Sequence, residues 1–122
     1  MKKLISIVEI PTTDFARAAS FYNSILNADI EEMEMGGIKM GLLSNSGEDV
    51  YVHLIHGEEY KPSADGVVVY LNCGNDLQQV AIKVAENGGR IIIPKTEIAP
   101  DIGFYAMFTD TEGNRLGLYS TS

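Results

Sequence analysis

The sequence predicts one α+β domain, built from two βαβββ units whose curled mixed sheets surround a shared cleft. The order strand, amphipathic helix and three short strands occurs twice, over about residues 4–56 and 66–120. The 122 residues, 45% of them hydrophobic, are enough for one buried core but few for two. Neither unit alone could bury both a helix and a sheet face. We therefore expect the pair to fold as a single domain over residues 1–122.

The first unit opens with ISIVEIP, a β-branched and apolar run that ends at Pro11 and predicts a strand. The following stretch, TTDFARAASFYNSIL, carries apolar residues at helical spacing and predicts a helix with Thr12 or Thr13 as N-cap. Three short strands should follow, with glycine-containing turns between them. The predicted strands are 29–33, 38–43 and 50–56, and the turns are 36–37 and 45–47.

The second unit repeats this order. GVVVYLNC predicts a strand, residues 76–87 predict a helix that Gly88 and Gly89 end, and RIIIPK, GFYAMF and RLGLYS predict three more strands. Aligning Asp14 with Asp76 superposes the apolar stripes of the two helices, which indicates an internal duplication. The polar segment 56–66 is the predicted linker, and we expect the loop 99–103 to form a lid over the cleft.

Charge and composition exclude several partners. Nine basic and seventeen acidic side chains give a formal charge of -8, which repels nucleic acid and anionic lipid and favours a cationic small molecule or a metal ion. The start, MKKLISIVEI, lacks a signal-peptide cleavage site, and no stretch approaches the ~20 apolar residues of a membrane span. The single cysteine, Cys73, fits a reducing compartment and is interpreted as a small apolar residue. We expect a soluble, cytoplasmic protein with no nucleic-acid or membrane partner.

Three stretches of the sequence resemble a known superfamily: IVEIPTTDFARAASFYNSIL, DLQQVAIKVAENGGRII and FTDTEGNRLGLYS. They are similar to the vicinal-oxygen-chelate superfamily, which includes glyoxalase I, extradiol dioxygenases, fosfomycin-resistance proteins and bleomycin-binding proteins. The segments YKPSADGVVVYLN and PKTEI resemble an uncharacterised glyoxalase-like branch. The resemblance implies the glyoxalase-like fold and a homodimer.

The resemblance also implies where a divalent cation would be held. Enzymes of the superfamily take one ligand from each of the first, fourth, fifth and eighth strands, and these positions fall here at Ile7, His53, Val68 and Gly117. Only His53 carries a donor atom, and His56 points to the opposite face of its strand. We therefore expect no metal and no cofactor, with open space at Gly117 where the superfamily has glutamate.

Alternation along the strands predicts an apolar pocket with a few polar groups on the face of the lost ligands. The carboxylate of Glu9 interrupts an apolar strand and needs a partner or the mouth of the cleft. It could bind a cation or act as a general base, or it could pair with Arg115 or a lysine, and both readings stay open. We predict no catalytic residue. The candidate ligand-binding residues are Glu9, His53, Tyr70, Asn72, Lys95, Tyr105 and Gly117.

Two acidic clusters have simpler interpretations. Residues 31–34 are interpreted as a charged sheet edge that discourages aggregation, and Asp110, Glu112 and Asn114 as turn-forming residues, not catalytic ones.

These features favour a metal-free small-molecule-binding protein of the glyoxalase and bleomycin-resistance type, with a cationic or apolar ligand. One alternative is a lyase or isomerase, similar to lactoylglutathione lyase, that has moved its metal or uses acid-base chemistry through Glu9 and His53. A structural or regulatory module is a third possibility, supported only by the lack of a recognisable catalytic set. The sequence leaves open whether the chain is an enzyme and which ligand it binds.

Overall fold

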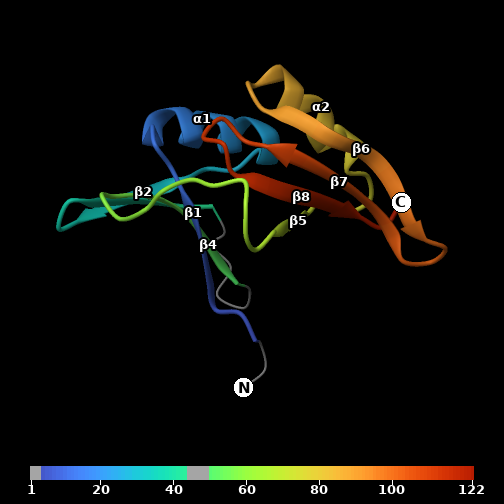
Figure 1. The fold of residues 1–122 in the computed structure, drawn as a ribbon, viewed down its shortest axis with the longest axis horizontal. Helices are drawn as coiled ribbons and strands as arrows, with labels where there is room; N and C mark the ends of the chain where they lie inside the picture. The colour runs from blue at the N-terminus through green and yellow to red at the C-terminus, as the bar shows by residue number, and fades with distance from the viewer. Residues whose placement is uncertain (1–3, 44–49) are drawn as a thin grey trace.

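The computed structural model describes residues 4–43 and 50–122 and contains the βαβββ order twice (Figure 1). The first unit consists of β1 (Ile7–Pro11), α1 (Phe15–Leu26), β2 (Glu31–Met35), β3 (Ile38–Leu42) and β4 (Tyr51–His56). The second consists of β5 (Tyr70–Asn72), α2 (Gln78–Glu86), β6 (Arg90–Ala99), β7 (Gly103–Thr109) and β8 (Arg115–Ser120). The predicted α+β class and duplication are confirmed. The turn predicted at 45–47 lies outside the described residues.

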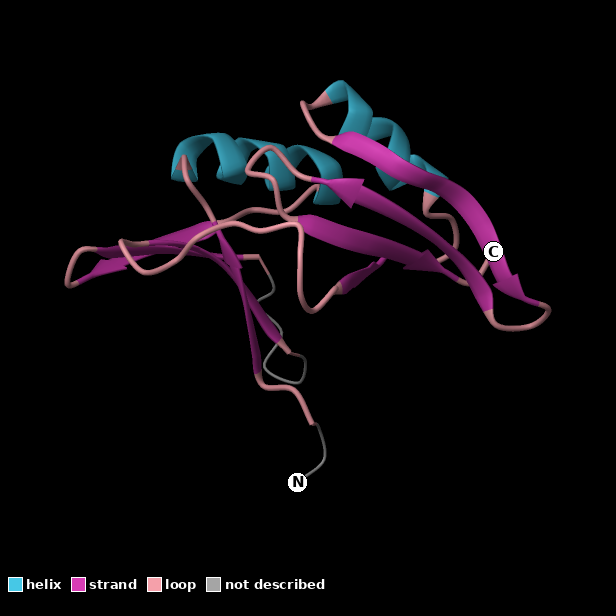
Figure 2. Cartoon of the chain, viewed as in Figure 1, coloured by secondary structure: helices cyan, strands magenta, loops and turns pink. Residues whose placement is uncertain are grey.

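Each unit forms one four-stranded mixed sheet, in the orders β1-β4-β3-β2 and β5-β8-β7-β6. In both sheets the first and last strands of the unit are parallel neighbours, and the other pairs are antiparallel. The two sheets do not close on one another. Figure 2 shows both helices on the same side of the molecule, so each sheet keeps a face that no helix covers.

The helices lie over the sheets because each has one apolar stripe to bury. Buried side chains of α1, α2 and the strands beneath them form one core cluster, in which Tyr22, Val84 and Leu118 have no exposed area. The α1 helix begins after Asp14, whose carboxylate accepts a hydrogen bond from the Arg17 backbone N–H at 3.1 Å. Neither helix in the described ranges is long and apolar enough to cross a bilayer.

The predicted N-cap was wrong. Asp14 caps α1, whereas the hydroxyl of Thr12 is buried and donates to the carbonyl oxygen of Ile55 on β4 at 3.1 Å. Both residue types can cap a helix, and the helix begins one or two residues later than the sequence pattern suggested.

The loop predicted at 99–103 is present as the turn of a hairpin, and its role as a lid stays a prediction. The β6 strand continues to Ala99 and pairs there with Gly103 at the start of β7, so these residues form the tip of a long hairpin. Register irregularities along β6 let this ten-residue strand curve without ending. Smaller differences concern β2, which runs from Glu31 to Met35 instead of 29–33, and β5, which is only three residues long.

Candidate functional site

The uncovered face of the first sheet carries side chains in rows across the strands. The register pairs Glu9 with His53, His53 with Leu42, and Leu42 with Glu31, so one row spans all four strands. Residues two apart in a strand share a face, and a second row on this face therefore consists of Pro11, Ile55, Met40 and Met33. The opposite face packs on α1, where the Phe15 ring lies against Gly41.

Side chains of β2, β3 and β4 enclose a hollow of about 280 Å³ on this uncovered face. Its lining is mostly apolar, with a carboxylate at one end and an imidazole at the other. The lining residues are Glu31, Met33, Met40, Leu42, Tyr51 and His53. An apolar wall with a few polar groups is the usual composition of a small-molecule site.

The imidazole of His53 has an unused hydrogen-bonding group. Its Nδ1 atom is buried and has no hydrogen-bond partner, and it is the one buried side-chain nitrogen or oxygen in that state within the described residues. Leaving such an atom unpaired costs about 1–3 kcal/mol. The Tyr51 ring lies nearby, with 6.4 Å between the ring centroids. The wall of the hollow therefore contains an imidazole with an unpaired nitrogen, in addition to the Glu31 carboxylate.

Glu9 lies beside His53 and is exposed, which agrees with one of the two arrangements expected for it. Because β1 is an edge strand, the Glu9 side chain is exposed and needs no partner to offset burial. The two ion pairs found in the described part of the chain are Arg17–Glu112 and Lys95–Asp76, so the alternative of a salt bridge to Arg115 is not observed. Glu9 also lines a smaller hollow of about 180 Å³, bordered by the linker residues Lys61 and Ser63.

On the second sheet, Tyr70 covers Gly117. The register pairs these two residues, and a Cβ atom built on Gly117 would lie 2.8 Å from Cγ of the Tyr70 ring, which is closer than real contacts allow. The expected open space at Gly117 is therefore wrong, because the ring fills it. An aromatic side chain across from a strand glycine shields the exposed backbone, and this packing explains why the position is a glycine.

Asn72 and Tyr105 lie on the second sheet, where their contacts are with neighbouring residues of that sheet. The Asn72 side chain accepts a hydrogen bond from the Gly74 backbone N–H at 3.0 Å and so forms a turn. Tyr105 pairs with Tyr119 across β7 and β8, on the face away from α2. Both lie on the second unit, apart from the hollow on the first sheet.

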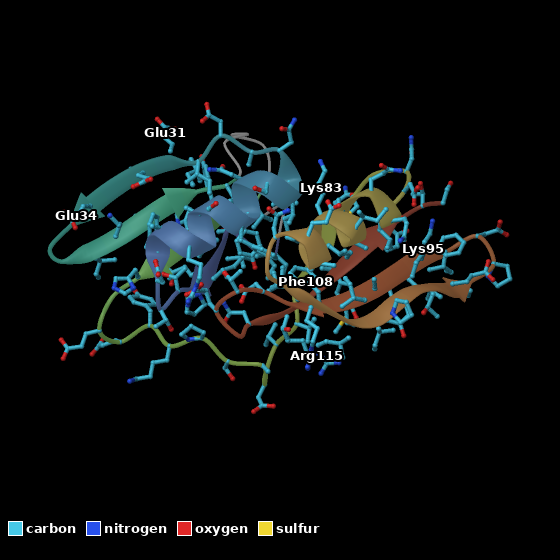
Figure 3. All side chains as sticks on the ribbon, turned by 90° about the horizontal axis from the view of Figure 1, so that it is seen from above. Glu31, Glu34, Lys83, Lys95, Phe108 and Arg115 are labelled. Carbon is cyan, nitrogen blue, oxygen red and sulfur yellow. The ribbon has the colours of Figure 1, made fainter. Side chains whose placement is uncertain are left out.

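Lys95 points to the helix side of the second sheet. Its ammonium group lies 2.8 Å from Oδ1 of Asp76 and 4.9 Å from the centroid of the Phe104 ring. Figure 3 shows Lys95 on the second unit near α2, and Glu31 on the first unit. The structure thus brings Glu9 together with His53 and Tyr70 together with Gly117, and it separates Lys95 from both pairs.

A family model described as the Glyoxalase/Bleomycin resistance protein/Dioxygenase superfamily matches residues 4–118, which is nearly the whole chain. The chain belongs to this superfamily. A glyoxylase-like domain-containing protein from Didymella fabae is 29% identical to it over 113 residues, which are 90% of this chain and 88% of that protein. The resemblance inferred from the sequence is confirmed.

Solved structures of superfamily members share this fold. A mutant of glyoxalase I from Zea mays aligns with a TM-score of 0.72 and 19% identity, over 95% of this chain and 46% of the maize chain. The fosfomycin resistance protein FosX from Listeria monocytogenes aligns with a TM-score of 0.71 and 14% identity, over 100% and 96% of the two chains. At these identities the likeness concerns the fold.

The residues of this chain do not fit the metal ion that superfamily enzymes hold. Of the four positions carried over from the resemblance, Ile7 and Val68 have hydrocarbon side chains and Gly117 lies under the Tyr70 ring. Across residues 4–43 and 50–122, no three His, Cys, Asp or Glu side chains gather closely enough to hold a metal ion. His53 alone cannot supply the coordination that a divalent cation needs.

The turn between β7 and β8 joins the two units, which the sequence analysis missed. The carboxylate of Glu112 accepts hydrogen bonds from the backbone N–H groups of Thr13 at 2.8 Å and Asp14 at 2.7 Å, and its other oxygen lies 2.7 Å from Nε of Arg17. Burial raises the pKa of Glu112, but the bonds from Arg17 and from the start of α1 outweigh it and lower this pKa to about 2. The sequence signal that could have indicated this link is an acidic turn residue, Glu112, in one unit and a basic residue, Arg17, in the first helical turn of the other.

Asp110 completes this junction. Its carboxylate accepts a hydrogen bond from the hydroxyl of Tyr22 on α1 at 2.7 Å and another from the Asn114 backbone N–H at 2.9 Å. Burial beside this carboxylate raises the pKa of Tyr22 well above its usual value. The prediction of turn-forming residues agrees with these contacts, which add a link from the turn to the first unit.

Proposed function

We propose that this chain is a small-molecule-binding member of the superfamily that works without the superfamily's metal ion. The observation that carries the proposal is the apolar hollow of about 280 Å³ with the unpaired Nδ1 atom of His53 at its wall. A ligand with an apolar body would remove Met33, Met40 and Leu42 from water, and a polar group on it would satisfy the imidazole. The lyase or isomerase alternative is not proposed, since no described contact of Glu9 or His53 favours catalysis over binding.

A screen of apolar fragments by saturation-transfer NMR tests this function. Leu42→Trp would fill the hollow from its floor, so we expect it to abolish the binding that the unaltered chain shows. Ile82→Trp is the matched control, because Ile82 is 48% exposed on α2, away from the hollow. Equal fragment binding by all three proteins, or none by the unaltered chain, would contradict the proposal.

The proposed functional state is a cytoplasmic homodimer. Large apolar side chains exposed on the uncovered face of the first sheet support it: Ile7 is 55% exposed, Met33 55% and Met35 67%. Several large apolar side chains exposed on one sheet face favour an interaction site in a soluble protein. Light scattering should give the mass of two chains, and a monomer at micromolar concentration would contradict this part of the proposal.

A further inference from the structure

The two ends of the hollow carry different polar groups, and the sheet register determines which group lies at each end. Glu31, Leu42 and His53 occupy one row on three neighbouring strands. Strands lie about 4.8 Å apart, so the backbone positions of Glu31 and His53 are separated by about 10 Å. A carboxylate thus stands at one end of the row and an imidazole at the other, with hydrocarbon between them.

The floor between these two polar ends suits a flat apolar group. Met33 and Met40 are direct cross-strand partners, and Leu42 and Tyr51 complete the wall. Thioether side chains are flexible and polarizable, and they make favourable contacts with aromatic rings. The row therefore fits an elongated molecule that carries an aromatic or aliphatic body.

Among the described residues, Glu31 is the one acidic or basic side chain that lines the hollow apart from the imidazole of His53. Glu31 forms no ion pair in the described part of the chain, and Glu9 extends the same row beyond His53. Lys39, on β3, is turned to the other face of the sheet, where its ammonium group lies 5.3 Å from the Phe15 ring centroid. An anionic ligand would be repelled from this row, whereas an ammonium group would find an available carboxylate.

We propose that the hollow selects apolar primary amines of about the length of the row, with the ammonium group on Glu31 and the apolar body over Met33, Met40 and Leu42. This inference rests on the proposed function and deepens it by naming the ligand class. The site lies on β2, β3 and β4 and shares only His53 with the superfamily's ion position, whose other residues fall on β1, β8 and the segment before β5.

Methionine-methyl NMR tests the proposal on the full chain. Phenylbutylamine and phenylbutanol serve as probes, because they share the apolar body and differ in charge. The amine should shift the methyl signals of Met33 and Met40 and leave that of Met107, which is 3% exposed on the second sheet. We expect the amine to bind about three- to tenfold more tightly than the alcohol, as one partly exposed charged hydrogen bond allows.

Two neighbouring glutamates give a matched pair of variants. Glu31→Gln should remove the preference for the amine, whereas Glu32→Gln should keep it, because Glu32 pairs with Gly41 on the other face of the sheet. Equal binding of amine and alcohol, or an unchanged preference in Glu31→Gln, overturns the ligand class and leaves the proposed function standing. Shifts at Met107 alone place the ligand elsewhere and overturn the site. Binding of neither probe together with an empty fragment screen overturns the proposed function itself.

Discussion

The Glu112 carboxylate should be a major source of stability, because it links the β7–β8 turn to the start of α1. Its side chain has 0% relative exposure and accepts hydrogen bonds from the Thr13 and Asp14 backbones and from Arg17. The pKa of Glu112 is lowered from 4.5 to about 2. At roughly 1.4 kcal/mol per unit, that lowering corresponds to about 3 kcal/mol in favour of the folded state. The variant Glu112→Gln should lose most of it at pH 7.

The pH dependence gives this prediction a sign. The folded state holds its proton on Glu112 less tightly than the unfolded state, so the contribution is complete above about pH 4.5 and declines as the pH falls toward 2. Urea unfolding followed by circular dichroism at several pH values measures it. The gap in unfolding free energy between the unaltered chain and Glu112→Gln should narrow between pH 5 and pH 3. The exposed Glu59→Gln is the control. A gap below about 1 kcal/mol at pH 7, or one that stays constant with pH, would refute the reasoning.

Three further predictions follow from single contacts. Gly117→Ala should lower the unfolding free energy by about 1–3 kcal/mol, because the new methyl group overlaps the Tyr70 ring. The loss should be smaller when Tyr70 is also changed to Ala. Equal losses with and without the Tyr70 ring would argue against the overlap. Asp14→Ala should cost about 1 kcal/mol in thermal or urea unfolding through loss of the α1 cap, and an unchanged stability would show that the cap is dispensable. Burial raises the pKa of Cys73, so its alkylation by iodoacetamide at pH 8 should be slower than that of a cysteine peptide, and a rate as fast as the peptide's would contradict this.

The architecture could be predicted from the sequence because the spacing of apolar residues indicates which face of each helix and strand is buried. The apolar stripes of the two helices and the strand alternation follow from what each element must bury, and the structure buries Tyr22 and Val84 at the matching helix positions. Strand ends were predicted less accurately, since the sequence pattern ended this strand at Lys95 and β6 continues to Ala99. Tertiary pairing with β7 keeps that segment extended.

The site could be predicted only in part, because its geometry depends on long-range register. Alternation places Gly117 on a face, but only the pairing of β5 with β8 reveals that the Tyr70 ring covers it. Glu31 lies on the exposed edge strand β2, in agreement with the charged-edge interpretation, and the register adds that it is one end of the row that leads to His53. Lys95 turns toward Asp76 on the helix side, a choice that local spacing does not determine.

Calorimetric titration of the chelator-treated protein with phenylbutylamine tests the central claim, which is binding in the His53 hollow without a metal ion. We expect saturable binding that is unchanged by EDTA and is lost in Leu42→Trp. Binding that disappears with EDTA and returns with a divalent cation, or that persists in Leu42→Trp, would contradict it.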